Sequence, residues 1–196
     1  MRGFLKILFL SFVLFPVTVG AATPQKAYFA GGCFWCMTPP FEKLKGVLKV
    51  TAGYADGQGD NPTYDDYADR GFTETVEILY DPAQISYSEL VGVYWKQINP
   101  TDAEGQFVDR GPQYRATIFT LNAKQKAEAE QSKSVLNKSG LYDKPIVTTV
   151  KAFTNFYPAE DYHQDFYKKN PVHYEMYHAA SGRDSYLDGI WGKGKH

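Results

Sequence analysis

The sequence predicts a two-layer α+β sandwich with a ferredoxin-like split βαβ core and an extended C-terminal tail. The expected elements follow the order strand, helix, strand, strand, helix, strand, with one more helix and strand behind them, which is the order of an extended split βαβ unit. The 196 residues contain no internal repeat and no low-complexity linker, and this length suits one ordinary domain.

Five strands are expected where apolar and polar side chains alternate. They are residues 26–29, 47–54, 74–80, 114–121 and 145–153. Residues 55–73, rich in Asp, Gly and Tyr, form a long loop, and residues 99–111 form another. Loops of such length in compact domains usually carry function, so both are candidates for the site.

Two helices are expected in the first half of the chain. The first begins at about Cys33, after Gly31-Gly32 turns the chain, and Pro39-Pro40 is expected to bend or divide it. The second begins at Ser86–Glu89, whose spacing is that of a capping box and which precedes a mostly helical apolar face.

A third helix is expected from Asn122, a capping residue, through Leu136, with Gly140 available to end it. The remaining segment, residues 155–196, is rich in Tyr and His and shows little clear periodicity. We therefore describe it only as an extended C-terminal tail and assign no helix or strand to it.

Residues 1–22 have the pattern of a secretory signal peptide. Arg2 and Lys6 precede an uncharged run, residues 7–22, that is apolar and ends in small residues. A membrane anchor is the alternative, but the run is shorter than the ~20 residues that a spanning helix prefers. We expect cleavage after the run, export (to the periplasm in a bacterium), no stable membrane association afterwards, and a single domain in residues 23–196.

Charge and composition narrow the class of partner. The net charge of −1 becomes −3 once Arg2 and Lys6 leave with the signal, and no run of Lys and Arg is suited to follow phosphates. We therefore expect no nucleic-acid partner. Aromatic residues make up 16% of the chain, which suits a pocket for a small apolar group, although an aromatic core is the simpler explanation.

The chain has only two cysteines, Cys33 and Cys36. An exported protein can form a structural disulfide. In the chain-entropy model, however, closing a four-residue loop stabilises a protein by only about 2 kcal/mol, against about 5 kcal/mol for a hundred-residue loop. This weak gain favours redox chemistry over a structural bridge.

The position of the two cysteines suits a nucleophile and a resolving thiol. At a helix N-terminus, Cys33 would face unpaired backbone N–H groups that lower its pKa, and Cys36, one turn later, falls within disulfide range. Phe34 and Trp35 either wall a pocket or pack against the sheet. A zinc site would need two of the four histidines, and His163 is more typical of a structural hydrogen-bonding residue.

Four blocks of sequence, taken together, resemble the A-type methionine sulfoxide reductases. They are Phe-Ala-Gly-Gly-Cys-Phe-Trp at 29–35, Asn-Pro-Thr-Tyr at 61–64, Asp-Arg-Gly-Pro-Gln-Tyr-Arg at 109–115 and Phe-Tyr-Pro-Ala-Glu-Asp-Tyr-His at 156–163. The blocks occur in the order of that family and span residues 27–171. Thioredoxins instead place Trp before the first cysteine and usually Gly-Pro between the two.

The resemblance implies a two-layer α+β sandwich for residues 23–196. It also implies thiol-dependent reduction of the S epimer of methionine sulfoxide, free or in oxidised peptides and proteins. In that case Cys33 is the nucleophile, and Phe34 and Trp35 hold the substrate methyl group. The expected biological role is repair of exported proteins under oxidative stress.

The resemblance further implies that Tyr64, Glu74 and Tyr114 bind the sulfoxide oxygen and that Asp109 supports the site. Physical chemistry agrees, because sulfoxide sulfur is a poor electrophile until its oxygen is hydrogen-bonded or protonated. A carboxyl group in an aromatic pocket has a raised pKa and can serve as the acid. Glu74 is the candidate for this role.

The chain departs from the common family form around its cysteines. Cys36 takes the position of a Gly, and the tail lacks the resolving cysteines that many members carry. A sulfenic acid on Cys33 would therefore be resolved by Cys36, and an outside dithiol would reduce the disulfide, a thioredoxin-like protein in vivo or dithiothreitol in vitro. Thr38 and Phe72 replace the usual Glu and His. No metal or organic cofactor is implied, and a monomer is expected.

Two other classes remain as alternatives. One is a general dithiol–disulfide oxidoreductase of the thioredoxin type, which the spacing of the cysteines also fits. The other is a non-catalytic, aromatic-rich binding domain with an incidental disulfide. Reduction of methionine sulfoxide and reduction of insulin disulfides would distinguish the three hypotheses.

Overall fold

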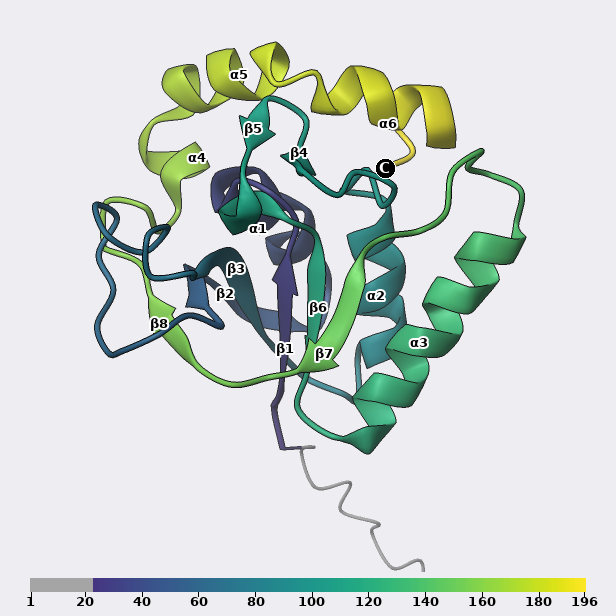
Figure 1. The fold of residues 1–196 in the computed structure, drawn as a ribbon, viewed down its shortest axis with the longest axis horizontal. Helices are drawn as coiled ribbons and strands as arrows, with labels where there is room; N and C mark the ends of the chain where they lie inside the picture. The colour runs from purple at the N-terminus through teal and green to yellow at the C-terminus, as the bar shows by residue number, and fades with distance from the viewer. Residues whose placement is uncertain (1–22) are drawn as a thin grey trace, which may run out of the picture.

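The computed structural model describes residues 23–196, so the expected signal peptide lies outside the described residues. A six-stranded sheet forms its centre (Figure 1). Its strands, in spatial order, are β7 (Thr149–Ala152), β6 (Thr117–Thr120), β1 (Gln25–Ala30), β3 (Thr73–Tyr80), β2 (Val47–Ala55) and β8 (Phe156–Pro158). Every neighbouring pair is antiparallel except β6 and β7. The expected mixed α and β architecture is confirmed, while its finer assignment as a ferredoxin-like core stays a prediction.

The alternation of side chains along β1 explains why the sheet has two different faces. Ala27 and Phe29 point into the main core, where they meet buried side chains of the helices. Tyr28 and Ala30 point to the opposite face and belong to a smaller aromatic cluster. The main core therefore lies between the sheet and the helices that follow β1, β3 and β6.

Three helices contribute to the main core: α1 (Phe34–Glu42), α2 (Tyr87–Trp95) and α3 (Ala123–Lys138). Their starts follow the predicted caps. The side chains of Ser86 and Glu89 form a reciprocal capping box, and Asn122 accepts from the backbone N–H of Gln125. Gly140 follows α3 at a φ of +71°, which places it just past the helix end as expected.

Pro39-Pro40 does not divide the first helix, because α1 continues through both prolines to Glu42, and a bend at these prolines stays a prediction. Proline removes a backbone donor in the helix interior. Here the helix extends only two residues beyond Pro40, so few hydrogen bonds are affected, and burial of Phe41 in the core holds the last turn.

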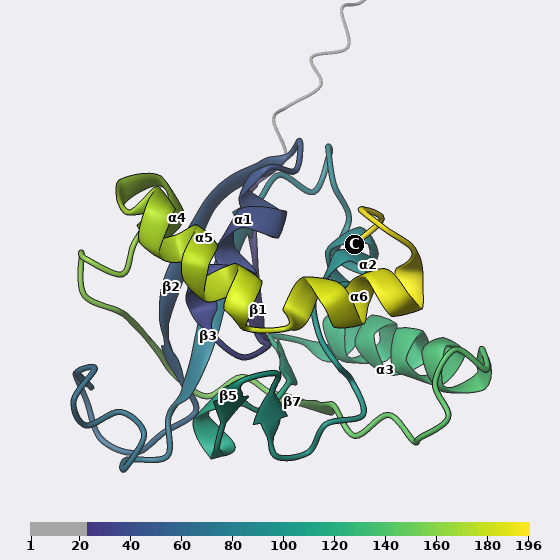
Figure 2. The ribbon, with the colours of Figure 1, turned by 90° about the horizontal axis from the view of Figure 1, so that it is seen from above.

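The extended C-terminal tail, to which the sequence assigned no helix, is in part helical. After β8 the chain forms α4 (Phe166–Lys169), α5 (Pro171–Ala180) and α6 (Arg183–Trp191). These three helices follow one another across the end of the sheet toward which β1 runs, above the start of α1 (Figures 1 and 2). None of the helices within residues 23–196 combines the length and apolar character that a membrane crossing requires.

Two expected strands are shorter than predicted at their starts. Tyr114 ends the short 3-10 helix η1 (Pro112–Tyr114), and β6 begins only at Thr117. Likewise β7 begins at Thr149, four residues after Pro145. The segment expected as a loop before η1 contains a two-stranded hairpin, β4 (Gly105–Gln106) and β5 (Asp109–Arg110). This hairpin places Asp109 beside the start of α1.

Candidate active site

The turn from β1 to α1 places Cys33 at the N-cap of α1. Gly32 adopts a φ of +82°, a left-handed conformation that favours glycine, and a Cβ there would lie 2.7 Å from Cβ of Gln106. The buried guanidinium of Arg183, from α6, donates to the carbonyl oxygen of Gly31 at 3.0 Å and also to that of Gln97. The C-terminal helices therefore hold the turn that carries the thiol.

We predict that Gly32→Ala destabilises the protein by about 3 kcal/mol, since it combines a strained φ with a steric clash. Gly71→Ala is the matched control, because Gly71 has a φ of +75° but nothing within 4 Å of an added Cβ. It should cost about 1 kcal/mol, from the backbone alone. Chemical denaturation followed by circular dichroism measures both values. Equal losses in the two variants would contradict the packing argument.

The two cysteines are free thiols, and both are buried. Each thiol shifts the pKa of the other across the first turn of α1. The sequence suggests a lowered pKa for Cys33 from its place at the helix N-terminus, but burial raises the pKa of this thiol, and its bond with Cys36 raises it further. The expectation is wrong for the substrate-free protein because desolvation outweighs the helix dipole. The hydrogen bond from Cys33 lowers the pKa of Cys36 instead.

A small cavity of about 90 Å³ opens at Cys33. Its lining comes from the start of α1, the loop before β3, β3 itself, the β5 and η1 region, and α5. The lining residues are Cys33, Phe34, Trp35, Tyr64, Glu74, Asp109, Tyr114 and Tyr177. The structure thus brings together seven of the eight site residues expected from the sequence. Cys36, the eighth, lines a different cavity.

Glu74 is the buried acid of this cavity, with 2% of its surface exposed. The backbone N–H of Phe34 donates to one carboxyl oxygen at 2.9 Å, and the hydroxyl of Tyr67 donates to the other at 2.9 Å. Burial raises the pKa of Glu74 well above its ordinary value, and the charge that Cys33 carries as a thiolate raises it further. The raised pKa favours the protonated carboxyl, so this group is suited to give a proton to a bound oxygen.

Asp109 and Tyr177 face Cys33 from the other side. The hydroxyl of Tyr177 lies 2.7 Å from both carboxyl oxygens of Asp109. Burial raises the pKa of Asp109 and likewise that of Tyr177, and the neighbouring Tyr177 hydroxyl opposes part of the rise in the pKa of Cys33. Because α5 supplies Tyr177, the tail completes the wall of the cavity beside the thiol.

Aromatic rings form the rest of the wall. The ring of Trp35 stacks on Phe166 with centroids 3.7 Å apart, and its Nε1–H donates to Nδ1 of His163 at 3.1 Å. His163 is buried and packs against Phe34, so it acts as the predicted hydrogen-bonding support. The sequence left two hypotheses for Phe34 and Trp35, a pocket wall or interior packing. Both side chains do both, because each packs against the core and lines the cavity.

Tyr64 and Tyr114 line the cavity, and each carries a phenol hydroxyl. Tyr64 is 42% exposed, and its backbone N–H donates to Glu160 at 2.8 Å. Burial raises the pKa of Tyr114, and the charge of Glu74 raises it further, so the hydroxyl keeps its proton and can donate. The cavity therefore combines one thiol, one protonatable carboxyl and phenol donors within an aromatic enclosure.

Sequence reasoning missed Tyr177, Tyr67 and Arg183. The spacing of Tyr174, Tyr177 and His178 is helical, at i, i+3 and i+4, and this signal could have identified one face of α5. No pattern singles out Tyr67 or Arg183, because their partners lie far away in the sequence. Within residues 23–196, no group of three or more His, Cys, Asp and Glu side chains is arranged to hold a metal ion.

A buried thiol, a second thiol one helical turn away and a buried acid are typical of oxidoreductases that act through cysteine. Comparisons with known proteins narrow this class. The family model described as peptide methionine sulfoxide reductase matches residues 25–195. The peptide methionine sulfoxide reductase MsrA of Listeria welshimeri is 54% identical over 169 residues, which is 85% of this chain and 96% of that protein.

MsrA 2 of Staphylococcus aureus is 46% identical and covers 87% of this chain and 97% of its own length. Among solved structures, methionine sulfoxide reductase A of Corynebacterium diphtheriae is 31% identical with a TM-score of 0.67, covering 76% of both chains. Reduced Mxr1 of Saccharomyces cerevisiae is 28% identical with a TM-score of 0.71, covering 76% of this chain and 87% of Mxr1. The chain belongs to the A-type peptide methionine sulfoxide reductase family of oxidoreductases.

Proposed function

We propose that this protein reduces the S epimer of methionine sulfoxide, free or in oxidised proteins and peptides, at the expense of thiols. The observation that carries the proposal is the placement of the Cys33 thiol and the raised-pKa carboxyl of Glu74 on one small aromatic cavity. A sulfoxide needs both a sulfur nucleophile and an acid at its oxygen. Family membership supports the same substrate.

In the first step, Cys33 attacks the sulfoxide sulfur while Glu74 gives its proton to the sulfoxide oxygen, assisted by Tyr64 and Tyr114. The sulfur–oxygen bond of the substrate breaks, and the oxygen ends on Cys33 as a sulfenic acid, so methionine is released. Phe34 and Trp35 enclose the methyl group. Overall, the sulfoxide and one thiol become a thioether and one sulfenic acid, and the proton that the Cys33 thiol loses replaces the proton that Glu74 gives to the oxygen.

In the second step, Cys36 attacks the Cys33 sulfenic acid, a disulfide forms and water leaves. An external dithiol then reduces the disulfide and becomes oxidised itself. Dithiothreitol serves in vitro, and we propose a thioredoxin-like protein in vivo. In support, Mxr1 of Saccharomyces cerevisiae has been solved in complex with Trx2. The cycle as proposed requires no metal or organic cofactor and a monomer suffices.

The test is turnover of dabsyl-methionine S-sulfoxide with dithiothreitol, with the R epimer as the matched control. We expect reduced product from the S epimer alone. No turnover of either epimer, together with reduction of insulin disulfides, would instead support a general dithiol oxidoreductase. Neither activity would support an aromatic-rich binding domain.

We further propose that residues 1–22 direct export, to the periplasm in a bacterial host, where the mature domain repairs oxidised proteins. The support is the basic start and the apolar run of signal-peptide length. Mass spectrometry of the exported protein should find an N-terminus near Thr23. A protein that stays in the cytoplasm with Met1 intact would contradict this prediction.

A further inference from the structure

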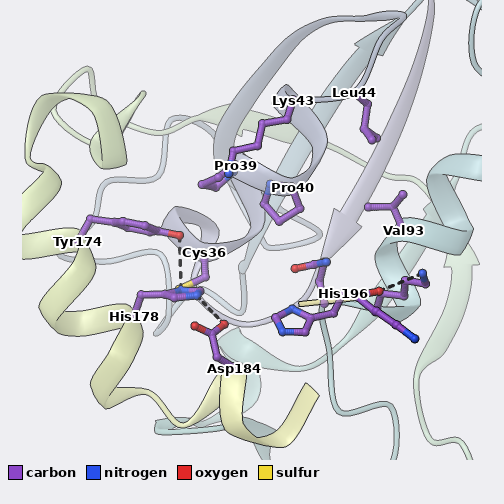
Figure 3. Close-up of a pocket in the computed structure, with 13 residues that line it drawn as sticks. Cys36, Pro39, Pro40, Lys43, Leu44, Val93, Tyr174, His178, Asp184 and His196 are labelled. Atoms are coloured by element: carbon purple, nitrogen blue, oxygen red, sulfur yellow. Dashed lines mark hydrogen bonds and ion pairs between the residues drawn. The ribbon is translucent and has the colours of Figure 1, made fainter. Parts of the chain in front are cut away.

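Cys36 lines a second cleft, separate from the cavity at Cys33 (Figure 3). This cleft has a volume of about 370 Å³ and lies between α1, α2 and the C-terminal helices. The two thiols are neighbours on one turn of α1, but they face two different openings. The proposed chemistry on Cys33 makes no use of the groups around Cys36.

The imidazole of His178, on α5, stands over Cys36, with Nδ1 3.3 Å from its Sγ. The other ring nitrogen, Nε2, lies 2.9 Å from Oδ1 of Asp184 on α6. Figure 3 shows this line of three side chains, with the hydroxyl of Tyr174 also near Nδ1, at 3.4 Å. Thiol, imidazole and carboxylate thus occur in the order that activates a cysteine nucleophile elsewhere.

The partners fix the proton positions on the ring. A carboxylate can only accept a hydrogen bond, so Asp184 selects the tautomer that carries its proton on Nε2. Nδ1 is then left with a lone pair directed at the S–H group of Cys36. The arrangement suits removal of the thiol proton.

The environment of Cys36 also favours its thiolate. The hydrogen bond from Cys33 lowers the pKa of Cys36, and the nearby buried Arg183 guanidinium lowers it further, against the effect of burial. Cys36 is buried to 1% exposure, so its proton cannot pass directly to bulk water. His178, whose side chain is 22% exposed, bridges the thiol and the cleft.

We propose that His178, oriented by Asp184, is the proton acceptor for Cys36 when this thiol resolves the Cys33 sulfenic acid. The inference rests on the proposed function. The proton of Cys36 moves to Nδ1, the Cys36 sulfur forms a bond with the Cys33 sulfur, and the S–O bond of Cys33 breaks. The hydroxide takes one proton from solvent that enters the substrate cavity and leaves as water, while His178 gives the Cys36 proton to solvent through the cleft, so no net proton is gained or lost.

A single-turnover experiment without reductant tests this inference in His178→Asn, which keeps a polar group near the position of Nδ1 but cannot carry the proton. Methionine release should occur at the rate and in the amount of the unmodified protein. The Cys33–Cys36 disulfide should form at least about 10-fold more slowly than in the unmodified protein. Acid quench at successive times and mass spectrometry measure this rate. Dimedone-reactive sulfenic acid should accumulate meanwhile.

Asp184→Asn should slow disulfide formation by a smaller factor, since the imidazole remains but loses its orientation. The matched control is His196→Asn, which alters a histidine that pairs with Asp188 at 3.2 Å and has no bond to a thiol. This control should resolve at the unmodified rate. Disulfide formation at that rate in His178→Asn would overturn the inference, whereas no methionine release from the unmodified protein would overturn the proposed function itself.

Discussion

Replacing Cys33 by Ser is expected to abolish reduction of methionine sulfoxide, lowering turnover by about 10³-fold or more. A serine hydroxyl is a far weaker nucleophile than a thiol, and it cannot accept the substrate oxygen to form a sulfenic acid. Cys33 is the only sulfur among the residues that line the substrate cavity. Turnover of dabsyl-methionine S-sulfoxide with dithiothreitol measures the effect.

Cys36→Ser is the comparison variant, because it removes the neighbouring thiol on the same turn of α1 and leaves Cys33 in place. It should lose the disulfide but still release about one equivalent of methionine per protein without reductant. Substantial turnover in Cys33→Ser would show that another group is the nucleophile. A folded state in both variants, checked by circular dichroism, removes unfolding as an explanation.

Glu74→Gln is expected to lower turnover by about 10²-fold to 10⁴-fold, the usual contribution of a general acid. The amide has nearly the same shape and can still accept from the N–H of Phe34, but it has no proton to give to the sulfoxide oxygen. The defect should fall on the first step, so the rate of methionine release in a single turnover is the measurement. The later step, disulfide formation, should follow release without further delay.

Glu77→Gln is the matched control for Glu74→Gln. Glu77 lies on the same strand but bonds to Lys26 and Tyr28, outside the cavity. Its replacement should leave methionine release unchanged. Equal losses in the two variants would indicate damage to β3, and an unaffected Glu74→Gln would assign the acid to another group.

The sheet was largely predictable because its signals are local. Alternation along β1, β2 and β3 and the caps at Ser86 and Asn122 depend on neighbouring residues. The C-terminal helices were not predictable by the same means. No side chain of α5 is buried, so this helix contributes a partly covered aromatic face rather than a buried apolar stripe.

The cavity was predictable only in part, and mainly through the family resemblance. Family resemblance placed Tyr64, Glu74 and Asp109 together, although they are distant in the sequence, and the structure brings them to one cavity. The positions of Tyr177 and His178 beside the two thiols could not be predicted from the sequence. They depend on α5 crossing over α1, and tertiary packing sets this arrangement. The raised pKa of Cys33 depends on the same cover, since burial causes it.

The central claim is that Cys33 takes the substrate oxygen. Its most direct test is a single turnover of Cys36→Ser with methionine S-sulfoxide in the presence of dimedone and without thiols, followed by mass spectrometry of the peptides. We predict about one methionine per protein and a dimedone adduct on the peptide that contains Cys33. Release of methionine without this adduct, or no release from a folded protein, would contradict the account.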